Sequence, residues 1–197
     1  MSGAGRPRPS GIVLAGGAGR RMGRPKAPIS LDGRPLVVMA AETLRSLCDY
    51  VVVVSRTDVA LPVLPSGTHL AHDLPGPDAP LTGVVTGLAA VPDGDVFVIA
   101  CDMPFAAPAL RALATVPPGI AAVAAADGRP QPLCARYPRR QALLVGRALL
   151  DAGEERAMAL PRAMGARQVE VPASALANLN TPDDLRRAAL RMAGCAA

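Results

Sequence analysis

The chain has few of the residues on which several common kinds of functional site depend. Of its 197 residues only two are tyrosine and two phenylalanine, and tryptophan is absent. Single-stranded nucleic acid is commonly bound by stacking bases on aromatic side chains, so such platforms are scarce here. Only two histidines occur, which leaves little material for a multi-histidine metal site or a histidine proton relay.

Cysteines are also few, and they are far apart. They stand at Cys48, Cys101, Cys134 and Cys195, with no Cys-x-x-Cys pair. Zinc ligands and redox-active cysteines usually come in closely spaced pairs, so we expect buried free thiols instead.

Long apolar runs are missing as well. No stretch approaches the roughly 20 uninterrupted apolar residues of a membrane span, and the first ten residues contain no apolar signal segment. We therefore expect a soluble, cytoplasmic protein without a membrane partner.

Lysine is the scarcest charged residue. Lysine and arginine together number 21, and Lys26 is the only lysine. It closes a glycine-rich loop, Leu14-Ala-Gly-Gly-Ala-Gly-Arg-Arg-Met-Gly-Arg-Pro-Lys26. A lysine kept in so arginine-rich a chain suggests a place where a compact ammonium fits and a planar guanidinium does not. Four basic residues lie in this loop, so chance alone would put the lysine there about one time in five.

The formal net charge of +5 is spread along the chain without a long basic run. It favours an anionic partner, and a small phosphorylated ligand fits this as well as nucleic acid does. A plain compositional bias toward arginine is the alternative explanation.

Apolar runs alternate with helical stretches along most of the chain. We expect strands at 11–15, 50–54, 68–71, 95–100, 120–125, 132–137 and 168–171. We expect helices at 35–47, 81–90, 108–114, 139–150 and 156–164, and a last one that starts within 180–184. This alternation predicts right-handed βαβ units in an α/β fold, a single-domain three-layer sandwich with a mostly parallel, Rossmann-like sheet. The domain is expected over 11–192, between a flexible lead-in at 1–10 and a tail at 193–197.

Ligands of such sheets bind outside the carboxyl ends of the strands. Three segments are expected there: the glycine-rich loop, Ser55, and Cys101-Asp102-Met103-Pro104. Glycines 16, 17, 19 and 23 would let backbone amides approach phosphate oxygens, and Arg20, Arg21 and Lys26 would neutralise them. The loop matches neither the Walker P-loop nor the dinucleotide fingerprint, and a tight strand-to-helix turn is its structural alternative.

Several polar residues have both a chemical and a structural interpretation. The Asp102 carboxylate is a hard oxygen ligand suited to Mg²⁺ on nucleotide phosphates, or it caps a helix. Asp73 could bind a nucleoside or stabilise a turn. Asn178 and Asn180 precede the last helix, where capping is the structural interpretation of Asn180.

Together these segments resemble the molybdenum cofactor guanylyltransferases. The resemblance is carried, in order across about residues 11–190, by Leu14-Ala-Gly-Gly17, Arg20-Arg-Met-Gly23 with Lys26, Pro80-Leu81-x-Gly83, Cys101-Asp-Met-Pro104, Gln131-Pro-Leu-Cys-Ala-Arg-Tyr137 and Asn178-Leu-Asn-Thr-Pro-Asp-Asp-Leu185. That family has a fold of the nucleotide-diphospho-sugar transferase type. It joins GMP from Mg-GTP to molybdopterin and releases pyrophosphate.

The resemblance implies a set of site residues. Catalysis is assigned to Lys26, Asp102 and Arg20, with Asp102 as the Mg²⁺ ligand. Binding of the nucleotide or the pterin is assigned to Leu14, Ala15, Gly16, Gly17, Gly19, Arg21, Lys26, Ser55, Asp73, Gly83, Asp102, Asn178 and Asn180. Asn178 and Asn180 would lie toward the pterin. The implied partners are GTP, molybdopterin and proteins that handle the molybdenum cofactor.

The choice of base rests on few positions. Gly16 and the Asn178-x-Asn180-Thr-Pro ending resemble the guanylyl branch, whereas Pro25 beside Lys26 resembles the cytidylyl branch. Ser55 stands where the family frequently has asparagine, and Ala79 replaces the glycine of Gly-Pro-Leu. A cytidylyl- or sugar-phosphate nucleotidyltransferase is therefore the nearest alternative. A non-catalytic nucleotide or cofactor carrier is the alternative of another class, and nucleic-acid binding is the third.

Overall fold

The structure is a computed structural model and describes residues 8–16, 29–73 and 79–194. Its centre is a seven-stranded sheet in the order β5-β4-β1-β6-β8-β7-β9. The strands, in that order, are Thr68–His72, Tyr50–Ser55, Ser10–Leu14, Asp95–Ala100, Arg129–Pro138, Ala122–Ala126 and Arg167–Glu170. All pairings are parallel except those of β8 with β6 and with β7. The prediction of an α/β fold with a mostly parallel sheet is confirmed.

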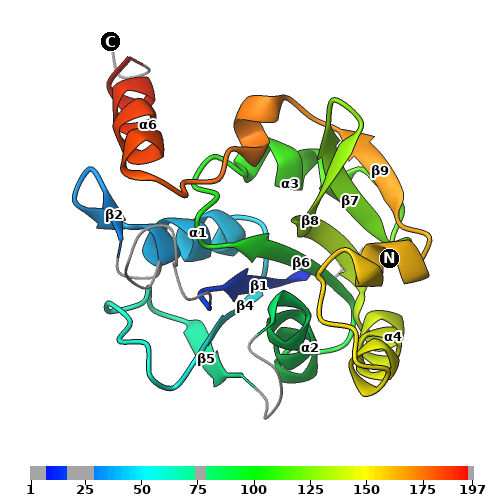
Figure 1. Cartoon of the computed structure of the whole chain (residues 1–197). Helices are drawn as coiled ribbons and strands as arrows, with labels where there is room; N and C mark the ends of the chain where they lie inside the picture. The colour runs from blue at the N-terminus through cyan, green and yellow to red at the C-terminus, as the bar shows by residue number, and fades with distance from the viewer. Residues whose placement is uncertain (1–7, 17–28, 74–78, 195–197) are drawn as a thin grey trace, which may run out of the picture.

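Helices cover both faces of the sheet (Figure 1). On one face lie α1 (Leu36–Arg45) and α3 (Ala107–Ala114), and on the other lie α2 (Pro80–Ala90), α4 (Arg139–Asp151) and α5 (Ala159–Ala163). Successive strand side chains point to opposite faces, so Val13 joins the core under α1 while Ile12 and Leu14 join the core under α2. The three layers of the predicted sandwich follow from this alternation.

Helix α2 packs very closely on β1 because it lacks a side chain at the contact. A Cβ placed on Gly87 would lie 2.5 Å from Cγ2 of Ile12, closer than real Cβ contacts come. Gly83, one turn earlier, faces Leu14 of the same strand. The glycines thus set the distance between α2 and the strand that leads into the predicted loop.

Two tight turns explain why some strands differ from the predicted ones. Asp127 and Gly128 both have positive φ angles, 52° and 67°, which is the geometry of a two-residue hairpin turn. That turn reverses the chain from β7 into β8, so β8 is antiparallel and starts earlier than predicted. Asp32 and Gly33, with φ of 54° and 75°, make the same kind of turn between β2 (Ser30–Leu31) and β3 (Arg34–Pro35), a hairpin that was not predicted.

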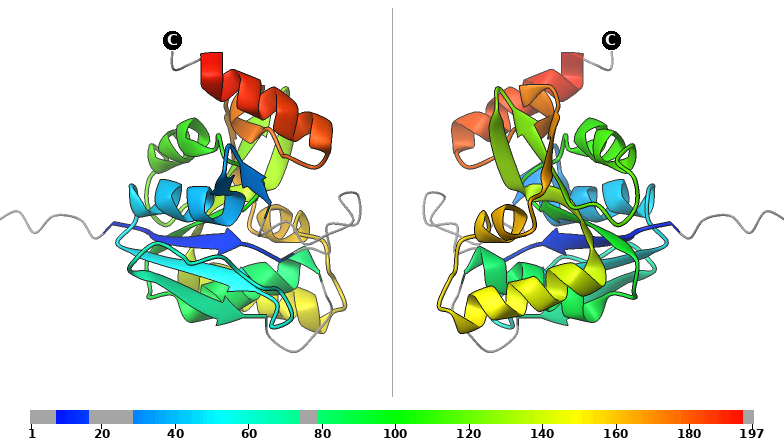
Figure 2. Two further views of the ribbon diagram at one scale, coloured as in Figure 1. Left: turned by 90° about the vertical axis from the view of Figure 1, so that its left-hand side faces the viewer. Right: turned by 90° about the vertical axis from the view of Figure 1, so that its right-hand side faces the viewer.

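Helix α6 (Pro182–Gly194) stands apart from the sheet and packs on the β2–β3 hairpin (Figure 2). A small apolar cluster joins them, with Leu31 from the hairpin, Leu179 from the segment before α6, and Ala188 from the helix. The chain reaches this helix from β9 through a short 3₁₀ turn, η1 (Ala173–Leu176).

The described part of the predicted lead-in contacts the body. Arg8 donates a hydrogen bond to the carbonyl of Leu47 at 3.3 Å, and the carbonyl of Pro9 accepts one from Asp49 at 3.3 Å. Residues 1–7 lie outside the described ranges. Within those ranges, no helix is long and apolar enough to cross a membrane.

Candidate active site

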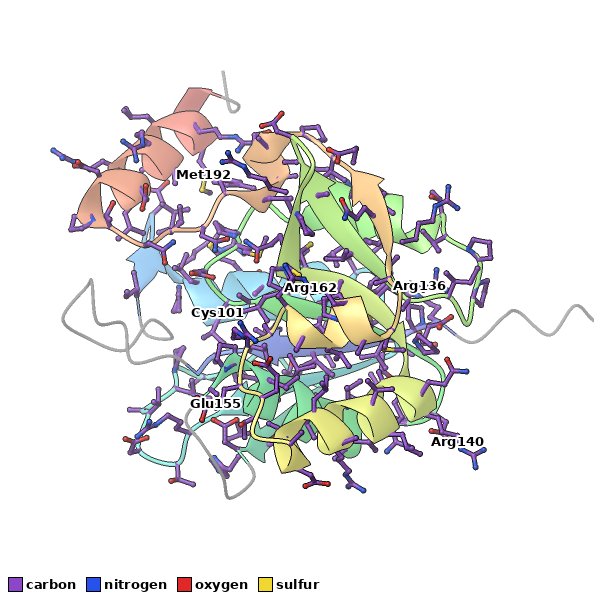
Figure 3. The ribbon with its side chains drawn as sticks, turned by 45° about the vertical axis from the view of Figure 1, so that its right-hand side comes forward. Cys101, Arg136, Arg140, Glu155, Arg162 and Met192 are labelled. Carbon is purple, nitrogen blue, oxygen red and sulfur yellow. The ribbon has the colours of Figure 1, made fainter. Side chains whose placement is uncertain are left out.

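Three parallel strands end together at one edge of the sheet. Leu14, the last residue of β1, is in register with Val54 of β4 and Ala100 of β6. The next residues stay paired, because Ala15 donates to the carbonyl of Val54 at 2.8 Å and Cys101 donates to that of Leu14 at 3.0 Å. Figure 3 shows Cys101 and Glu155 toward this end of the molecule, and Arg136 and Arg140 at the opposite end. The edge therefore carries the segments expected there.

Asp73 lies directly between two glycines from other elements. A Cβ on Gly16 would be 3.6 Å from one carboxylate oxygen of Asp73, and a Cβ on Gly83 would be 3.6 Å from the other. The backbone N–H of Asp73 donates to the carbonyl of Ser55 at 3.1 Å. The carboxylate is thus held beside the ends of β1 and β4 and the first turn of α2, with no side chains from the two glycines around it.

Ser55 and Thr82 bury hydroxyl groups near this edge. Ser55, at the end of β4, is fully buried, and Thr82 lies in the first turn of α2. Neither hydroxyl has a hydrogen-bond partner among the residues that the structure describes. Buried hydroxyls in native proteins are normally hydrogen-bonded, so orphaned ones mark places where a ligand or water completes the structure.

Asp102 sits just beyond β6 and is buried, with 4% of its surface exposed. Helix α3 begins at Ala107 and its N-cap residue is Ala106, so Asp102 is not the N-cap of that helix. Its backbone carbonyl accepts a hydrogen bond from the N–H of Leu179 at 2.9 Å. That bond brings Asn178 and Asn180, from near the end of the chain, alongside Asp102.

The last helix is capped by residues other than Asn180. The Thr181 hydroxyl accepts from the N–H of Asp184 at 3.1 Å, and the Asp184 carboxylate accepts from the N–H of Thr181 at 2.8 Å. This reciprocal pair is a capping box. The hydrogen bond from the Thr181 hydroxyl is the largest cause that lowers the pKa of Asp184. The capping interpretation of Asn180 is therefore wrong, because Thr181 caps the helix.

Gln131 is a neighbour of the site that received no role from the sequence. Its side-chain NH₂ donates to Oδ1 of the Asn178 side chain at 3.4 Å, which orients the NH₂ of Asn178 away from Gln131. Glu155 also reaches this region, since its backbone carbonyl accepts from Leu81 at the start of α2, at 3.3 Å. The sequence did contain a sign that Gln131 has a role in the site, because it is a polar amide between two prolines at the start of β8.

The predicted site residues fall into two groups. Those placed along this edge are Leu14, Ala15, Gly16, Ser55, Asp73, Gly83, Asp102, Asn178 and Asn180. Gly17, Gly19, Arg20, Arg21 and Lys26 lie outside the described residues.

The site could bind a metal ion only if most of the ion's ligands come from molecules other than the protein. Within the described ranges, no group of three or more His, Cys, Asp or Glu side chains could hold a metal ion. Asp102 is a single buried carboxylate at the edge of the sheet. Magnesium commonly takes one or two carboxylates and fills its shell with water and phosphate oxygens, so Asp102 fits Mg²⁺ only in company with phosphates.

Known proteins resemble the chain over nearly its whole length. A family model described as the MobA-like NTP transferase domain matches residues 11–170. A molybdenum cofactor guanylyltransferase of Cereibacter sphaeroides is 40% identical over 190 residues, covering 90% of this chain and 94% of the relative. A probable molybdenum cofactor guanylyltransferase of Chloroflexus aggregans is 37% identical over 193 residues, covering 90% and 91%.

Solved structures share the fold. Molybdopterin-guanine dinucleotide biosynthesis protein A from Archaeoglobus fulgidus superposes with a TM-score of 0.71 at 24% identity, covering 94% of this chain and 99% of that one. A 2-C-methyl-D-erythritol 4-phosphate cytidylyltransferase from Thermus thermophilus gives a TM-score of 0.72 at 21% identity, covering 93% and 98%. The family match and the sequence relatives together show that the chain is a nucleotidyltransferase of the MobA-like family and belongs with the molybdenum cofactor guanylyltransferases.

Proposed function

We propose that this protein transfers GMP from Mg-GTP to the phosphate of molybdopterin, forming the guanine dinucleotide form of the molybdenum cofactor and pyrophosphate. The observation that carries the proposal is the meeting of two polar groups at one sheet edge. Asp73 lies there between Gly16 and Gly83, and Asp102 is hydrogen-bonded to the Asn178–Asn180 segment. The names of the sequence relatives support the same reaction.

The donor nucleotide is assigned to the β1, β4 and α2 side of the site. A carboxylate only accepts hydrogen bonds, and guanosine offers donors in its N1–H, its 2-amino group and its ribose hydroxyls. Asp73 is an acceptor of this kind, and Gly16 and Gly83 place no side chain of their own beside it. The buried Ser55 hydroxyl, which has no partner among the described residues, is a further group for the nucleoside to satisfy.

The chemistry needs positioning more than proton transfer. An oxygen of the pterin phosphate attacks the α-phosphorus of GTP in line and forms a new O–P bond. The bond from the α-phosphorus to the bridging oxygen of pyrophosphate breaks, and its electron pair leaves on that pyrophosphate oxygen. A phosphate nucleophile is already ionised at neutral pH, so no general base is required. This agrees with a chain that has only two histidines.

The residues that manage charge are assigned as follows. Asp102 would hold Mg²⁺, which neutralises phosphate oxygens when bound. Lys26 and Arg20 would neutralise the triphosphate, with Arg21 and the amides of Gly17 and Gly19 beside them. Asn178 and Asn180 would face the pterin.

The proposal places the reaction in the cytoplasm, with neither nucleic acid nor a membrane as partner. Its product would pass to proteins that handle the molybdenum cofactor. No observation favours the carrier or the nucleic-acid alternative.

The experiment is pyrophosphate release by the purified protein with molybdopterin, Mg²⁺ and either GTP or CTP. We expect release with GTP that depends on both molybdopterin and the metal ion, and much slower release with CTP. Preference for CTP would support the cytidylyl alternative. Nucleotide binding without pyrophosphate release would support a carrier.

A further inference from the structure

We propose that Arg191, on α6, is a positioning residue that holds the Asn178–Asn180 segment in place against Asp102. The inference rests on the proposed function, in which these asparagines face molybdopterin, the molecule that accepts GMP. Arg191 itself lies in the last turns of α6 and is not expected to touch either substrate.

The guanidinium of Arg191 joins two separate chain segments. Its central carbon lies 4.2 Å from the centre of the Phe105 ring, and Nη1 donates to the carbonyl oxygen of Ser174 at 2.9 Å. Phe105 follows Asp102 by three residues, and Ser174 precedes Asn178 by four. A cation over an aromatic face and a charged donor on a carbonyl are both attractive contacts, so Arg191 ties the Asp102 segment to the Asn178 segment.

The two tied segments meet where the polar residues lie. Leu179 donates to the carbonyl of Asp102 at 2.9 Å, and the residue is 3% exposed within the small apolar cluster. This backbone bond sets the register of Asn178 and Asn180 relative to the Asp102 carboxylate. Arg191 links the same two segments through Phe105 and Ser174.

The position of helix α6 determines the position of Asn180, because only Thr181 separates Asn180 from the helix and the hydrogen bonds of the capping box fix that turn. The Thr181–Asp184 capping box fixes the first turn, and the Asp184 carboxylate also accepts from the N–H of Asn180 at 3.0 Å. Apolar contacts hold one side of α6, and Figure 3 shows Met192 on the side that faces the rest of the molecule. Arg191 adds the polar link that stops the helix from shifting along that apolar surface.

Movement of the Asn178–Asn180 segment would affect the binding of molybdopterin more than the binding of GTP. In-line transfer depends on the placement of the attacking oxygen, and small displacements are costly. Asp73, Gly16 and Gly83, which are assigned to the nucleoside, belong to other segments than the two that Arg191 contacts. Loss of Arg191 should therefore raise KM for molybdopterin and leave GTP binding unchanged.

The test compares Arg191→Ala with Arg191→Lys and with a matched control, Arg186→Ala. Arg186 is an exposed arginine on the same helix, and within the described part of the chain it forms an ion pair with the exposed Asp183. Hydrogen exchange at the Leu179 amide reports docking on Asp102 without any substrate. Arg191→Ala should speed that exchange about tenfold and raise KM for molybdopterin by a similar factor, as expected for loss of one cation–π contact and one charged hydrogen bond.

The remaining readouts separate positioning from general destabilisation. Affinity for GTP should stay near wild type in Arg191→Ala, and the melting temperature should fall by only a few degrees. Arg191→Lys should recover part of the Leu179 amide protection and part of the KM for molybdopterin, because its ammonium can still lie over the ring. Phe105→Leu, which keeps an apolar side chain and removes the aromatic face, should repeat the Arg191→Ala pattern more weakly.

Two results would overturn the inference. One is Leu179 exchange and molybdopterin KM in Arg191→Ala that match Arg186→Ala. The other is an equal loss of GTP affinity. A wild-type protein that releases no pyrophosphate would instead reject the proposed function, and the exchange measurement would still decide whether Arg191 holds the segment.

Discussion

The backbone N–H of Leu179 donates a 2.9 Å hydrogen bond to the carbonyl oxygen of Asp102. One bond thus joins Asp102, two residues after the end of the central β6 strand, to the segment that leads into the last helix. Because it uses only backbone atoms, it survives substitution of the Asp102 side chain. The carboxylate can therefore be altered without undocking Asn178 and Asn180.

Replacing Asp102 by asparagine tests the carboxylate alone. The side chain keeps its size but loses the charge that would hold Mg²⁺, and electrostatic groups of this kind contribute about 100- to 1000-fold to kcat. We expect a loss of this order in pyrophosphate release. Leu179 amide exchange should remain at the wild-type rate, and an Asp102→Asn enzyme with full activity would remove Asp102 from the mechanism.

Asp73→Asn tests the acceptor assigned to guanosine. The new amide presents an NH₂ group where a ligand donor is expected, so a charged hydrogen bond is lost. Affinity for GTP, measured by calorimetry, should fall by about tenfold or more. An unchanged affinity would mean that Asp73 only stabilises the turn after β5.

Gly83→Ala should separate stability from binding. Alanine is favoured over glycine within a helix by about 0.5–1 kcal/mol, so the free energy of unfolding should rise. Its methyl group would lie 3.6 Å from an Asp73 oxygen, in the space assigned to the ligand. Urea unfolding and GTP titration should therefore move in opposite directions, and a variant that binds GTP as tightly as wild type would contradict this placement.

Arg136→Met tests a buried ion pair far from the site. Arg136 donates to the Asp95 carboxylate at 2.6 Å and to the carbonyls of Leu113 and Val116, and its side chain is 6% exposed. Removing it leaves the Asp95 carboxylate, which is only 13% exposed, without its cation, at a cost of about 3–5 kcal/mol in the free energy of unfolding. Below the lowered melting temperature, KM for GTP should match wild type, and a loss under 1 kcal/mol by urea unfolding would contradict the estimate.

The buried thiols should respond to alkaline pH. Burial raises the pKa of Cys48, and that of Cys134, from 9.0 to about 12. The folded chain keeps both thiols protonated, whereas the unfolded chain ionises them from pH 9 upward. Their contribution to stability is therefore full below pH 9 and falls as the pH rises toward 12. At pH 8 both should resist iodoacetamide until the protein is unfolded, and rapid labelling of the native protein, mapped by mass spectrometry, would contradict this.

Much of the fold was predictable because local pattern and tertiary environment agree. The sequences of β1, β4 and β6 are continuous apolar runs because helices bury both faces of these strands, and such runs predict buried strands. Since parallel strands end at the same edge of a sheet, Ser55 and Asp102 were correctly predicted to lie at one edge. The direction of β8 was missed although Asp127-Gly128 is a strong hairpin signal. Asp32-Gly33 carried the same signal for the β2–β3 hairpin.

The contacts that complete the site were less accessible from the sequence. Nothing in the spacing of Asp73, Gly16 and Gly83 shows that the carboxylate lies between the two glycines, because that contact depends on how closely α2 packs on β1. The Arg191 contacts depend likewise on where α6 packs on the β2–β3 hairpin. Asp184, not Asn180, completes the cap with Thr181, and the spacing of these two residues was a usable sign of a capping box.

The most direct test of the proposed reaction follows the α-phosphate. The protein is incubated with Mg²⁺, molybdopterin and GTP labelled at the α-phosphorus, and the pterin product is isolated and weighed by mass spectrometry. We predict that the label enters the pterin together with guanosine, giving a product whose mass is that of molybdopterin plus GMP less one water. Label that remains in unreacted nucleotide, or a product formed from CTP in preference to GTP, would contradict it.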